Sequence, residues 1–394
     1  MTHTDATVSR TSESARPTGR RLPLLDVLRG AAILGTLMTN VWIFTGPGAE
    51  WGALQSDSGE PSFGSAAGAV EGTFSVLANG KFLSLLTILF GVGLAIQYGS
   101  AARRGQPWPG RYRWRALFLF GEGTVHFVLV FAWDVLMGYA VTALLVAWLL
   151  TRSERAQRRV MWWAAGAHLT VIGLLTAGLA LSDDDGGGTV SQDVVDLYAH
   201  GGYPDQIAFR LENAIALRME PVLTFFLLVF LFLLGVRLFR AGAFGADETG
   251  RRLRARLLAW GIGLGLPLNV AAVLAGPDLF LLARYGTAPL LALGYIGLIG
   301  AVVDRVRRPG PLMTGLTSVG RTALSGYVLQ NVLCVLISYG IGLGLAQRLD
   351  DTGPWWVVGL WVTVCAVLMV GSTLWLRRFS AGPLESVQKW ALRH

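Results

Sequence analysis

The runs VLTFFLLVFLFLLG (residues 222–235) and VVGLWVTVCAVLMVGSTLWL (residues 357–376) contain no charged side chain. They approach or reach the ~20 residues that a helix needs to cross a bilayer. Only 15% of the 394 residues are charged and 53% are hydrophobic, whereas about a quarter of the residues of a soluble protein are charged. The sequence therefore predicts an all-α protein, a polytopic bundle of transmembrane helices.

Apolar segments of this kind recur along the whole chain and predict about ten spans. They lie at about residues 24–44, 82–100, 115–132, 136–150, 160–181, 221–239, 257–275, 283–303, 321–345 and 355–376.

Arginines gather in every second connection between these segments, which is the positive-inside pattern of membrane topology. Ten spans with both termini in the cytoplasm satisfy this pattern. The same distribution accounts for the net charge of +8 and argues against a nucleic-acid partner. The basic connections contain Arg103, Arg104, Arg111, Arg113 and Arg115, then Arg152, Arg155, Arg158 and Arg159, then Arg251, Arg252, Arg254 and Arg256, then Arg305, Arg307 and Arg308, and finally Arg377 and Arg378.

Composition divides the chain into three parts. Residues 1–20 are rich in Ser, Thr and Arg and predict a disordered cytoplasmic arm. Residues 21–379 form the transmembrane domain, and residues 380–394 form a cytoplasmic tail. The outer connections 45–81 and 182–220 are long, and we expect an acceptor-facing surface there. For the acidic run at residues 183–185 the alternative is a mobile loop. Within the second, DQIAFRLENAIALRMEP (residues 205–221) is amphipathic and predicts an interfacial helix.

Ionisable groups inside spans are costly and survive mainly in bundle interiors or polar cavities. In the first span, Asp26 and Arg29 are three residues apart, and Asn40 follows Arg29 by three helical turns on the same face. This spacing predicts a polar stripe across most of the membrane. The alternative is a snorkelling arginine with a capping aspartate, and an amide that holds two helices together.

The third span carries Glu122 and His126 at i and i+4, with Asp134 at its outer end. A carboxylate beside an imidazole holds its tautomer and raises its basicity, which suits a general base. The alternative is a buried, hydrogen-bonded histidine without a catalytic role. His168 has no acidic neighbour at helical spacing and predicts a packing residue.

The remaining polar and small residues of the spans give weaker signals. We expect Gly91 and Gly93 to allow close helix packing, and Glu385 to lie on the cytoplasmic surface. Cys334 and Cys365 lack the spacing of a disulfide framework or a zinc site, and no metal site is predicted. Lys81, Arg284, Tyr285, Gln330 and Asn331 complete the set of polar groups in or beside the spans.

Four ordered blocks carry a resemblance to a known family: LPLLDVLRGAAILGTLMTN (22–40), GKFLSLLTILFGVGLA (80–95), His126 with WDVLMGYA (133–140), and GRTALSGYVLQNVLC (320–334) with WLRRFSAGPLE (375–385). The chain resembles the YeiB-like bacterial family of integral-membrane proteins of unknown function from about residue 21 to 390, with a carboxyl-terminal family block at about 240–390. The resemblance places the protein in the bacterial plasma membrane.

That family is distantly similar to the transmembrane acyltransferase superfamily, which includes acyltransferase-3 proteins and heparan-α-glucosaminide N-acetyltransferases. The superfamily's first span carries an arginine, ten residues and usually a histidine. Arg29, ten residues and Asn40 follow this spacing, and the heparan branch is similar in its asparagine. An amide cannot act as a general base, so any base must lie elsewhere, at His126.

The resemblance implies an acyltransferase that uses cytoplasmic acyl-CoA as a co-substrate, with no permanently bound cofactor, and acylates a small-molecule, glycan or peptide acceptor beyond the outer face. Arg29, oriented by Asp26, would bind the donor. Asn40 would donate to the oxyanion, and His126, oriented by Glu122 or Asp134, would deprotonate the acceptor. Two alternatives stay open: a proton-coupled transporter or exporter, and a non-catalytic membrane partner that contacts lipids.

Overall fold

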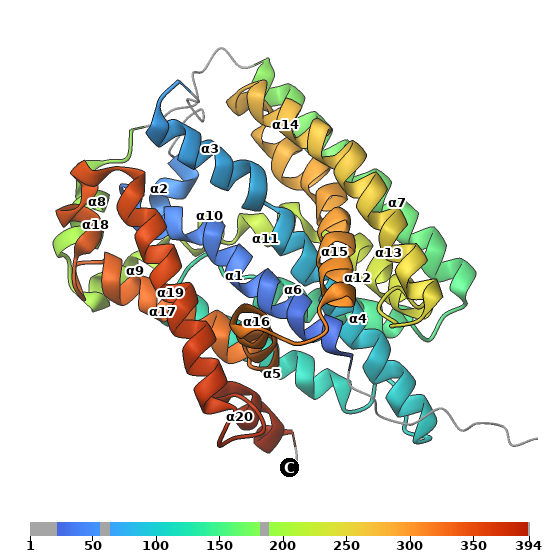
Figure 1. The fold of residues 1–394 in the computed structure, drawn as a ribbon. Helices are drawn as coiled ribbons and strands as arrows, with labels where there is room; N and C mark the ends of the chain where they lie inside the picture. The colour runs from blue at the N-terminus through green and yellow to red at the C-terminus, as the bar shows by residue number, and fades with distance from the viewer. Residues whose placement is uncertain (1–21, 56–63, 182–188, 393–394) are drawn as a thin grey trace, which may run out of the picture.

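The computed structural model describes residues 22–55, 64–181 and 189–392, and these residues fold as an all-α bundle (Figure 1). Six helical stretches among them are long and apolar enough to cross a membrane, which identifies a multi-pass helical membrane protein. The arm predicted at residues 1–20 and the acidic run at residues 183–185 lie outside the described residues. The six stretches are Pro23–Thr45, Ala66–Arg103, Glu154–Ala180, Glu248–Leu274, Pro277–Arg305 and Pro354–Trp375.

Each of the ten predicted apolar segments falls on helical structure. The number of spans and the cytoplasmic termini stay predictions, because only the six stretches named above satisfy length and apolarity together. The helices on these segments are α1 (Pro23–Thr45), α4 (Lys81–Arg103), α5 (Tyr112–Leu129), α6 (Leu136–Leu149), α7 (Glu154–Ala180), α12 (Phe225–Arg240), α13 (Glu248–Trp260) with α14 (Leu266–Leu274), α15 (Ala288–Arg305), α17 (Ala323–Ser338) and α19 (Pro354–Trp375).

Prolines mark where several helices begin. Pro23 and Pro354 occupy the first turn of α1 and α19, where the missing N–H is not needed. The segment predicted at 321–345 is shorter, because α17 ends at Ser338 and the chain then turns, with Gly344 at φ +61°. A helix that the sequence did not predict, α16 (Pro311–Arg321), precedes α17.

Helix α1 lies at the centre of the bundle and packs against α4, α16, α17 and α19 (Figure 1). Glycine permits the closest approach, because a Cβ at Gly320 of α16 would lie 1.7 Å from the carbonyl oxygen of Asp26. On α4, a Cβ at Gly91 would lie 2.1 Å from the carbonyl oxygen of Phe232. No described atom comes within 4 Å of such a Cβ at Gly93, so the expected packing role holds for Gly91 alone.

The two long connections that the charge pattern predicts to be outer are helical over most of their described residues. The first forms α2 (Ala49–Gln55) and α3 (Ala66–Ala78), and the second forms α8 (Gln192–His200). The single interfacial helix predicted at 205–221 is instead three short helices, α9 (Tyr203–Glu212), α10 (Ala214–Leu217) and α11 (Met219–Leu223). The described parts of these connections are therefore mostly helical, and the acidic run for which a mobile loop was the alternative lies outside them.

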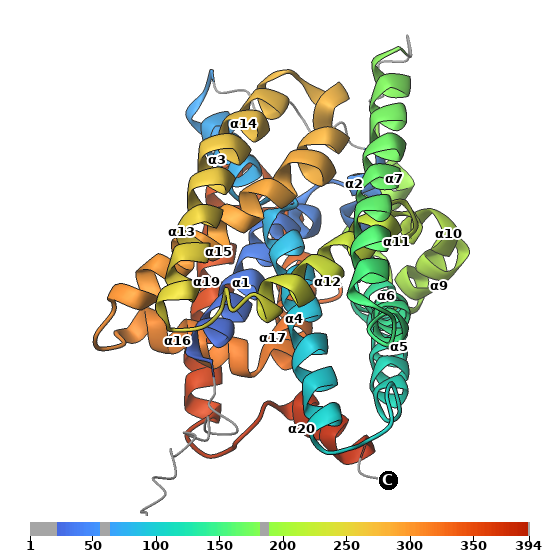
Figure 2. The same cartoon turned by 90° about the vertical axis from the view of Figure 1, so that its right-hand side faces the viewer.

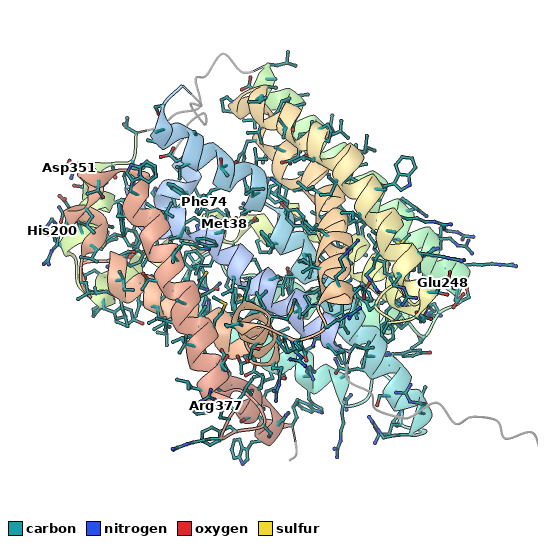
Figure 3. All side chains as sticks on the ribbon, viewed as in Figure 1. Met38, Phe74, His200, Glu248, Asp351 and Arg377 are labelled. Carbon is teal, nitrogen blue, oxygen red and sulfur yellow. The ribbon has the colours of Figure 1, made fainter. Side chains whose placement is uncertain are left out.

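The two ends of the bundle differ in the elements that they carry. The final helix α20 (Pro383–Ala391) lies at one end, and α3 and α14 lie at the opposite end (Figure 2). Figure 3 shows His200 and Asp351 together on one side of the molecule, far from Glu248 and Arg377. The predicted orientation places Glu248, Arg377 and α20 on the cytoplasmic side.

Candidate functional site

Asp134 organises the turn between α5 and α6. One of its carboxylate oxygens accepts hydrogen bonds from the backbone N–H groups of Leu136 and Met137, at 3.0 and 3.3 Å, and so caps the start of α6. Gly123 allows this approach, because a Cβ there would lie 2.7 Å from the same carboxylate. Asp134 is buried, and the Arg218 guanidinium donates to its backbone carbonyl at 2.9 Å.

His126 is buried against this turn. Its Nδ1 lies 3.6 Å from Asp134 Oδ1, and its Nε2 lies 3.1 Å from the amide nitrogen of Asn331. The ring stacks on Tyr327 with 5.3 Å between centroids, and the Tyr327 hydroxyl donates to Asp134 Oδ1 at 3.3 Å. Residues far apart in the sequence, on α5 and α17, thus meet around one imidazole.

Glu122 does not orient His126, although the two residues share a helical face. Both of its carboxylate oxygens are buried and have no hydrogen-bond partner in the described part of the chain. The i, i+4 spacing places the two side chains on one face of α5. The His126 ring nevertheless lies against the α5–α6 turn, where its Nδ1 is 3.6 Å from Asp134 Oδ1. Of the two predicted orienting groups, only Asp134 contacts the ring.

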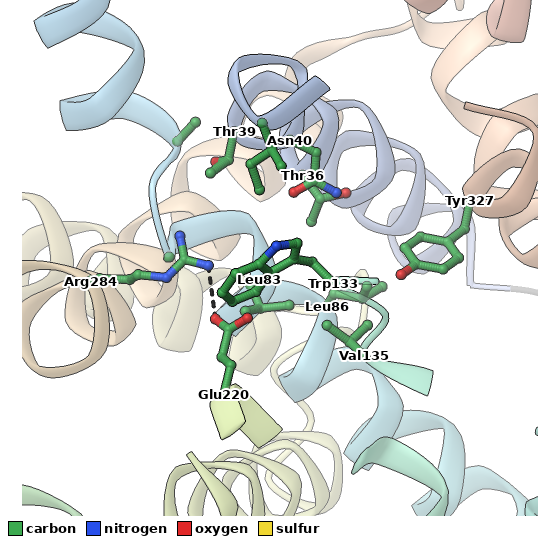
Figure 4. Close-up of a pocket in the computed structure, with 13 residues that line it drawn as sticks. Thr36, Thr39, Asn40, Leu83, Leu86, Trp133, Val135, Glu220, Arg284 and Tyr327 are labelled. Atoms are coloured by element: carbon green, nitrogen blue, oxygen red, sulfur yellow. Dashed lines mark hydrogen bonds and ion pairs between the residues drawn. The ribbon is translucent and has the colours of Figure 1, made fainter. Parts of the chain in front are cut away.

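A small cavity of about 30 Å³ lies on the other side of Tyr327 (Figure 4). Asn40 lines it together with Thr36 and Thr39 of α1, as the predicted polar stripe requires. His126 is not among the lining residues, although Tyr327, on which its ring stacks, is one of them. The volume suits a few water-sized atoms rather than a whole ligand.

Glu220 and Arg284 form the opposite wall of the cavity (Figure 4). Arg284 Nη2 donates to Glu220 Oε1 at 2.8 Å, and the Tyr285 hydroxyl donates to the same oxygen at 2.6 Å. Arg284 also donates to Asn79, which precedes α4. Sequence reasoning noted Arg284 and Tyr285 but missed Glu220. The signal that could have found it is a lone carboxylate at the end of the amphipathic stretch, directly before an apolar run.

Asp26 and Arg29 lie at the other end of α1 from Asn40. Arg29 Nη1 lies 3.5 Å from Asp26 Oδ1, so the predicted pair exists. The Asp26 side chain is buried and that of Arg29 is partly exposed. The predicted stripe therefore has a charged end at Arg29 and an amide that reaches the cavity at Asn40.

A second buried ion pair, missed by sequence reasoning, fastens the outer connections. Arg210 of α9 donates two hydrogen bonds to the Glu50 carboxylate of α2, at 2.8 and 3.0 Å, and both residues are 0% exposed. The Tyr198 hydroxyl donates to Glu50 at 3.0 Å, and that of Tyr339 at 3.4 Å. Burial, followed by the charge of Glu50, raises the pKa of Tyr198, which keeps the hydroxyl protonated as a donor.

Glu385 has a structural role that differs from the surface position predicted for it. Its carboxylate accepts from the backbone N–H of Leu324 at 2.8 Å and from the Ser325 hydroxyl at 2.5 Å. A carboxylate at this position satisfies the free N–H groups at the start of α17. The tail helix α20 is thereby tied to the helix that carries Tyr327 and Asn331.

Within residues 22–55, 64–181 and 189–392, no group of three His, Cys, Asp or Glu side chains is arranged to hold a metal ion. Cys334 and Cys365 are buried free thiols. His168 Nε2 donates a hydrogen bond to the backbone carbonyl of Tyr285 at 3.1 Å, as a packing residue would.

Comparison with known proteins finds similarity to a family and to proteins that have no assigned reaction. Residues 238–393 match the family "Protein of unknown function (DUF418)". That segment contains Arg284, Tyr327, Asn331 and Glu385. The whole chain is also similar to two uncharacterized bacterial proteins. YxaH of Bacillus subtilis is 27% identical over 93% of this chain and 93% of its own length. YeiB of Escherichia coli is 27% identical over 92% of this chain and 93% of its own length.

Proposed function

We propose that this protein is an integral-membrane acyltransferase that moves an acyl group from acyl-CoA to a hydroxyl or amine acceptor at or beyond the outer face. The observation that carries the proposal is the position of Tyr327. Its ring stacks on His126, its hydroxyl donates to Asp134, and it lines the cavity that holds Asn40. A hydroxyl backed by a buried carboxylate and imidazole, beside an amide donor, suits proton removal and oxyanion stabilisation.

The reaction would run through these groups as follows. The acceptor oxygen or nitrogen attacks the thioester carbonyl carbon, and Asn40 donates a hydrogen bond to the developing oxyanion. The acceptor proton passes to the Tyr327 oxygen as the tyrosine proton moves to the Asp134 carboxylate, while the His126 ring packs against the tyrosine and holds it in place. The carbon–sulfur bond then breaks, the thiolate takes up the proton, and an ester or amide and free CoA are released.

The two ends of α1 suit the two substrates of such a transfer. Asn40 lies eleven residues beyond Arg29, about 16 Å along a helix. Arg29, held by Asp26, would bind phosphate or carbonyl oxygens of the donor near the predicted cytoplasmic end. The small cavity admits only the reacting groups, so the body of each substrate would remain outside it.

Release of free thiol from acetyl-CoA by the full chain in nanodiscs tests the proposal. Tyr327→Phe removes only the hydroxyl, and we expect at least about a hundredfold loss of rate, the low end of the contribution of an acid–base group. His126→Gln should also shift the pH at which the rate is half-maximal. His168→Gln is the matched control, since it changes a buried histidine that contacts Tyr285 instead. Wild-type protein that neither binds nor cleaves acetyl-CoA would refute the proposal.

A proton-coupled transporter is the second candidate, because Glu122 is buried without a hydrogen-bond partner in the described residues and lies one turn from His126. Proteoliposomes that take up a solute with a pH gradient, and lose uptake with Glu122→Gln, would favour transport over acyl transfer. Absence of both acyl transfer and uptake in the wild-type protein would leave the non-catalytic membrane partner.

A further inference from the structure

A larger hollow lies between α7 and α12, apart from the cavity at Tyr327. Its volume of about 450 Å³ falls within the range of ligand sites. We name it the arginine pocket, after the side chains that line it. These are Glu154, Gln157 and Arg158 at the start of α7, and Leu233, Arg237, Arg240 and Ala241 at the end of α12.

The charge of the arginine pocket is positive, with three guanidinium groups and one carboxylate. The carboxylate of Glu154 lies 3.7 Å from Arg240 and its side chain is 82% exposed, so solvent screens this pair. The side chains of Arg158 and Arg237 form no hydrogen bond or ion pair with another described residue. Two guanidinium groups therefore remain available to an anion in the pocket.

A buried side-chain amide, that of Gln157, holds the Arg240 guanidinium in place. Its Nη1 donates to Gln157 Oε1 at 2.9 Å. Gln157 is buried, and its amide nitrogen in turn donates to the carbonyl of Arg152 at 2.8 Å. An arginine held in place loses less rotamer freedom when it binds an anion, and its planar fork matches phosphate oxygens.

Aromatic side chains next to the arginine pocket indicate its depth in the membrane. Trp162, one turn beyond Arg158 on α7, is 61% exposed and packs against Phe230 of α12 with 6.0 Å between ring centroids. Exposed tryptophans of membrane proteins gather at the level of the lipid headgroups. Arg158 lies nearer than Trp162 to the start of α7, and Arg237 and Arg240 lie at the end of α12. The charge pattern assigns both of these helix ends to the cytoplasmic side.

We infer that the arginine pocket binds the phosphate of an anionic phospholipid headgroup of the inner leaflet. Basic pockets between helices on the cytoplasmic side suit such headgroups. Exposed apolar side chains of α7, such as Trp162 and Leu169, would contact the acyl chains. The inference is independent of the acyltransferase proposal, because none of the pocket residues lies at the cavity near Tyr327.

Native mass spectrometry of the purified full chain, titrated with phosphatidylglycerol or phosphatidylcholine in detergent, tests this inference. Wild-type protein should retain phosphatidylglycerol at least about fivefold more strongly than phosphatidylcholine, the effect of one basic residue near an anionic lipid. The variant Arg158→Gln/Arg237→Gln/Arg240→Gln should lose this preference. The exposed single change Arg237→Gln should weaken it by about fivefold without a threat to folding.

The charge-matched control removes three exposed arginines of another connection, Arg305, Arg307 and Arg308. We expect it to keep the preference for phosphatidylglycerol. An equal loss in both triple variants would show a diffuse surface charge and overturn the inference. Inorganic phosphate that displaces phosphatidylglycerol at the same concentration would show a site for free phosphate rather than lipid, and would overturn it as well.

Discussion

Replacement of Glu50 by glutamine tests the outer ion pair. The substitution keeps the shape of the side chain but removes its charge, and leaves the Arg210 guanidinium buried without a counter-ion. Both side chains are 0% exposed, and Arg210 donates through Nε and Nη2 to the two carboxylate oxygens. The loss of one partner of a buried pair destabilises a protein by about 3–5 kcal/mol.

This magnitude can be compared with the remaining contacts of the guanidinium. Its Nη1 keeps the hydrogen bond to the Val128 carbonyl at 3.2 Å, so this contact does not change the expected loss. The hydroxyls of Tyr198 and Tyr339 lose a charged acceptor at the same time. We therefore expect the melting temperature of Glu50→Gln to fall by about 5–10 °C. This estimate uses a shift of about 2 °C per kcal/mol, because the shift becomes smaller as the chain becomes longer.

Thermal unfolding in a mild detergent, followed by size-exclusion chromatography of the heated samples, measures this change. Glu248→Gln is the control, because its pair with Arg252 is exposed and should contribute less than about 1 kcal/mol. The double change Glu50→Gln/Arg210→Gln should recover part of the loss, since it leaves no uncompensated charge. A melting temperature of Glu50→Gln within about 1 °C of the wild type would show that the pair does not hold the outer connections.

Three further predictions concern packing, the tail and topology. Gly91→Ala should destabilise the protein by about 1–3 kcal/mol in the same thermal assay, because its Cβ would meet the backbone of α12, whereas Gly93→Ala should have little effect. Glu385→Ala removes the cap of α17 and should cost about 0.5–2 kcal/mol, with faster trypsin cleavage of α20; cleavage at the wild-type rate would contradict the capping role. A fluorescent protein fused to the carboxyl terminus should fluoresce inside the cell. Single cysteines introduced into the loops can be labelled with low background, because the native Cys334 and Cys365 are buried. Labelling of the basic connections from outside the cell would contradict the predicted topology.

The local sequence was sufficient for the helices on the apolar segments and for part of the site. Apolar runs predict helices because each backbone polar group in a membrane must be bonded within its own segment. Helical spacing also placed Asp26 beside Arg29 and brought Asn40 to a polar cavity. These features depend on residues a few turns apart on one helix, which the sequence records directly.

Spacing on one helix gave a wrong prediction where a residue outside that helix contacts the same side chain. Glu122 has the i, i+4 relation to His126, yet Asp134 makes the contact because the α5–α6 turn folds back on the ring. Asn331 and Tyr327 reach the same ring from α17, about two hundred residues away along the chain. No periodicity links these positions, so only the packing of α5 against α17 could reveal the site.

The sequence by itself determined that this protein is a helical membrane protein, because the composition and the length of the apolar runs are properties of single segments. The tertiary structure decided which of its few charges meet. Glu50 with Arg210, Glu220 with Arg284, and Glu385 with the start of α17 join elements that are remote in sequence. A buried charge needs a partner, but many partners are chemically equivalent, and the choice among them depends on how the helices pack.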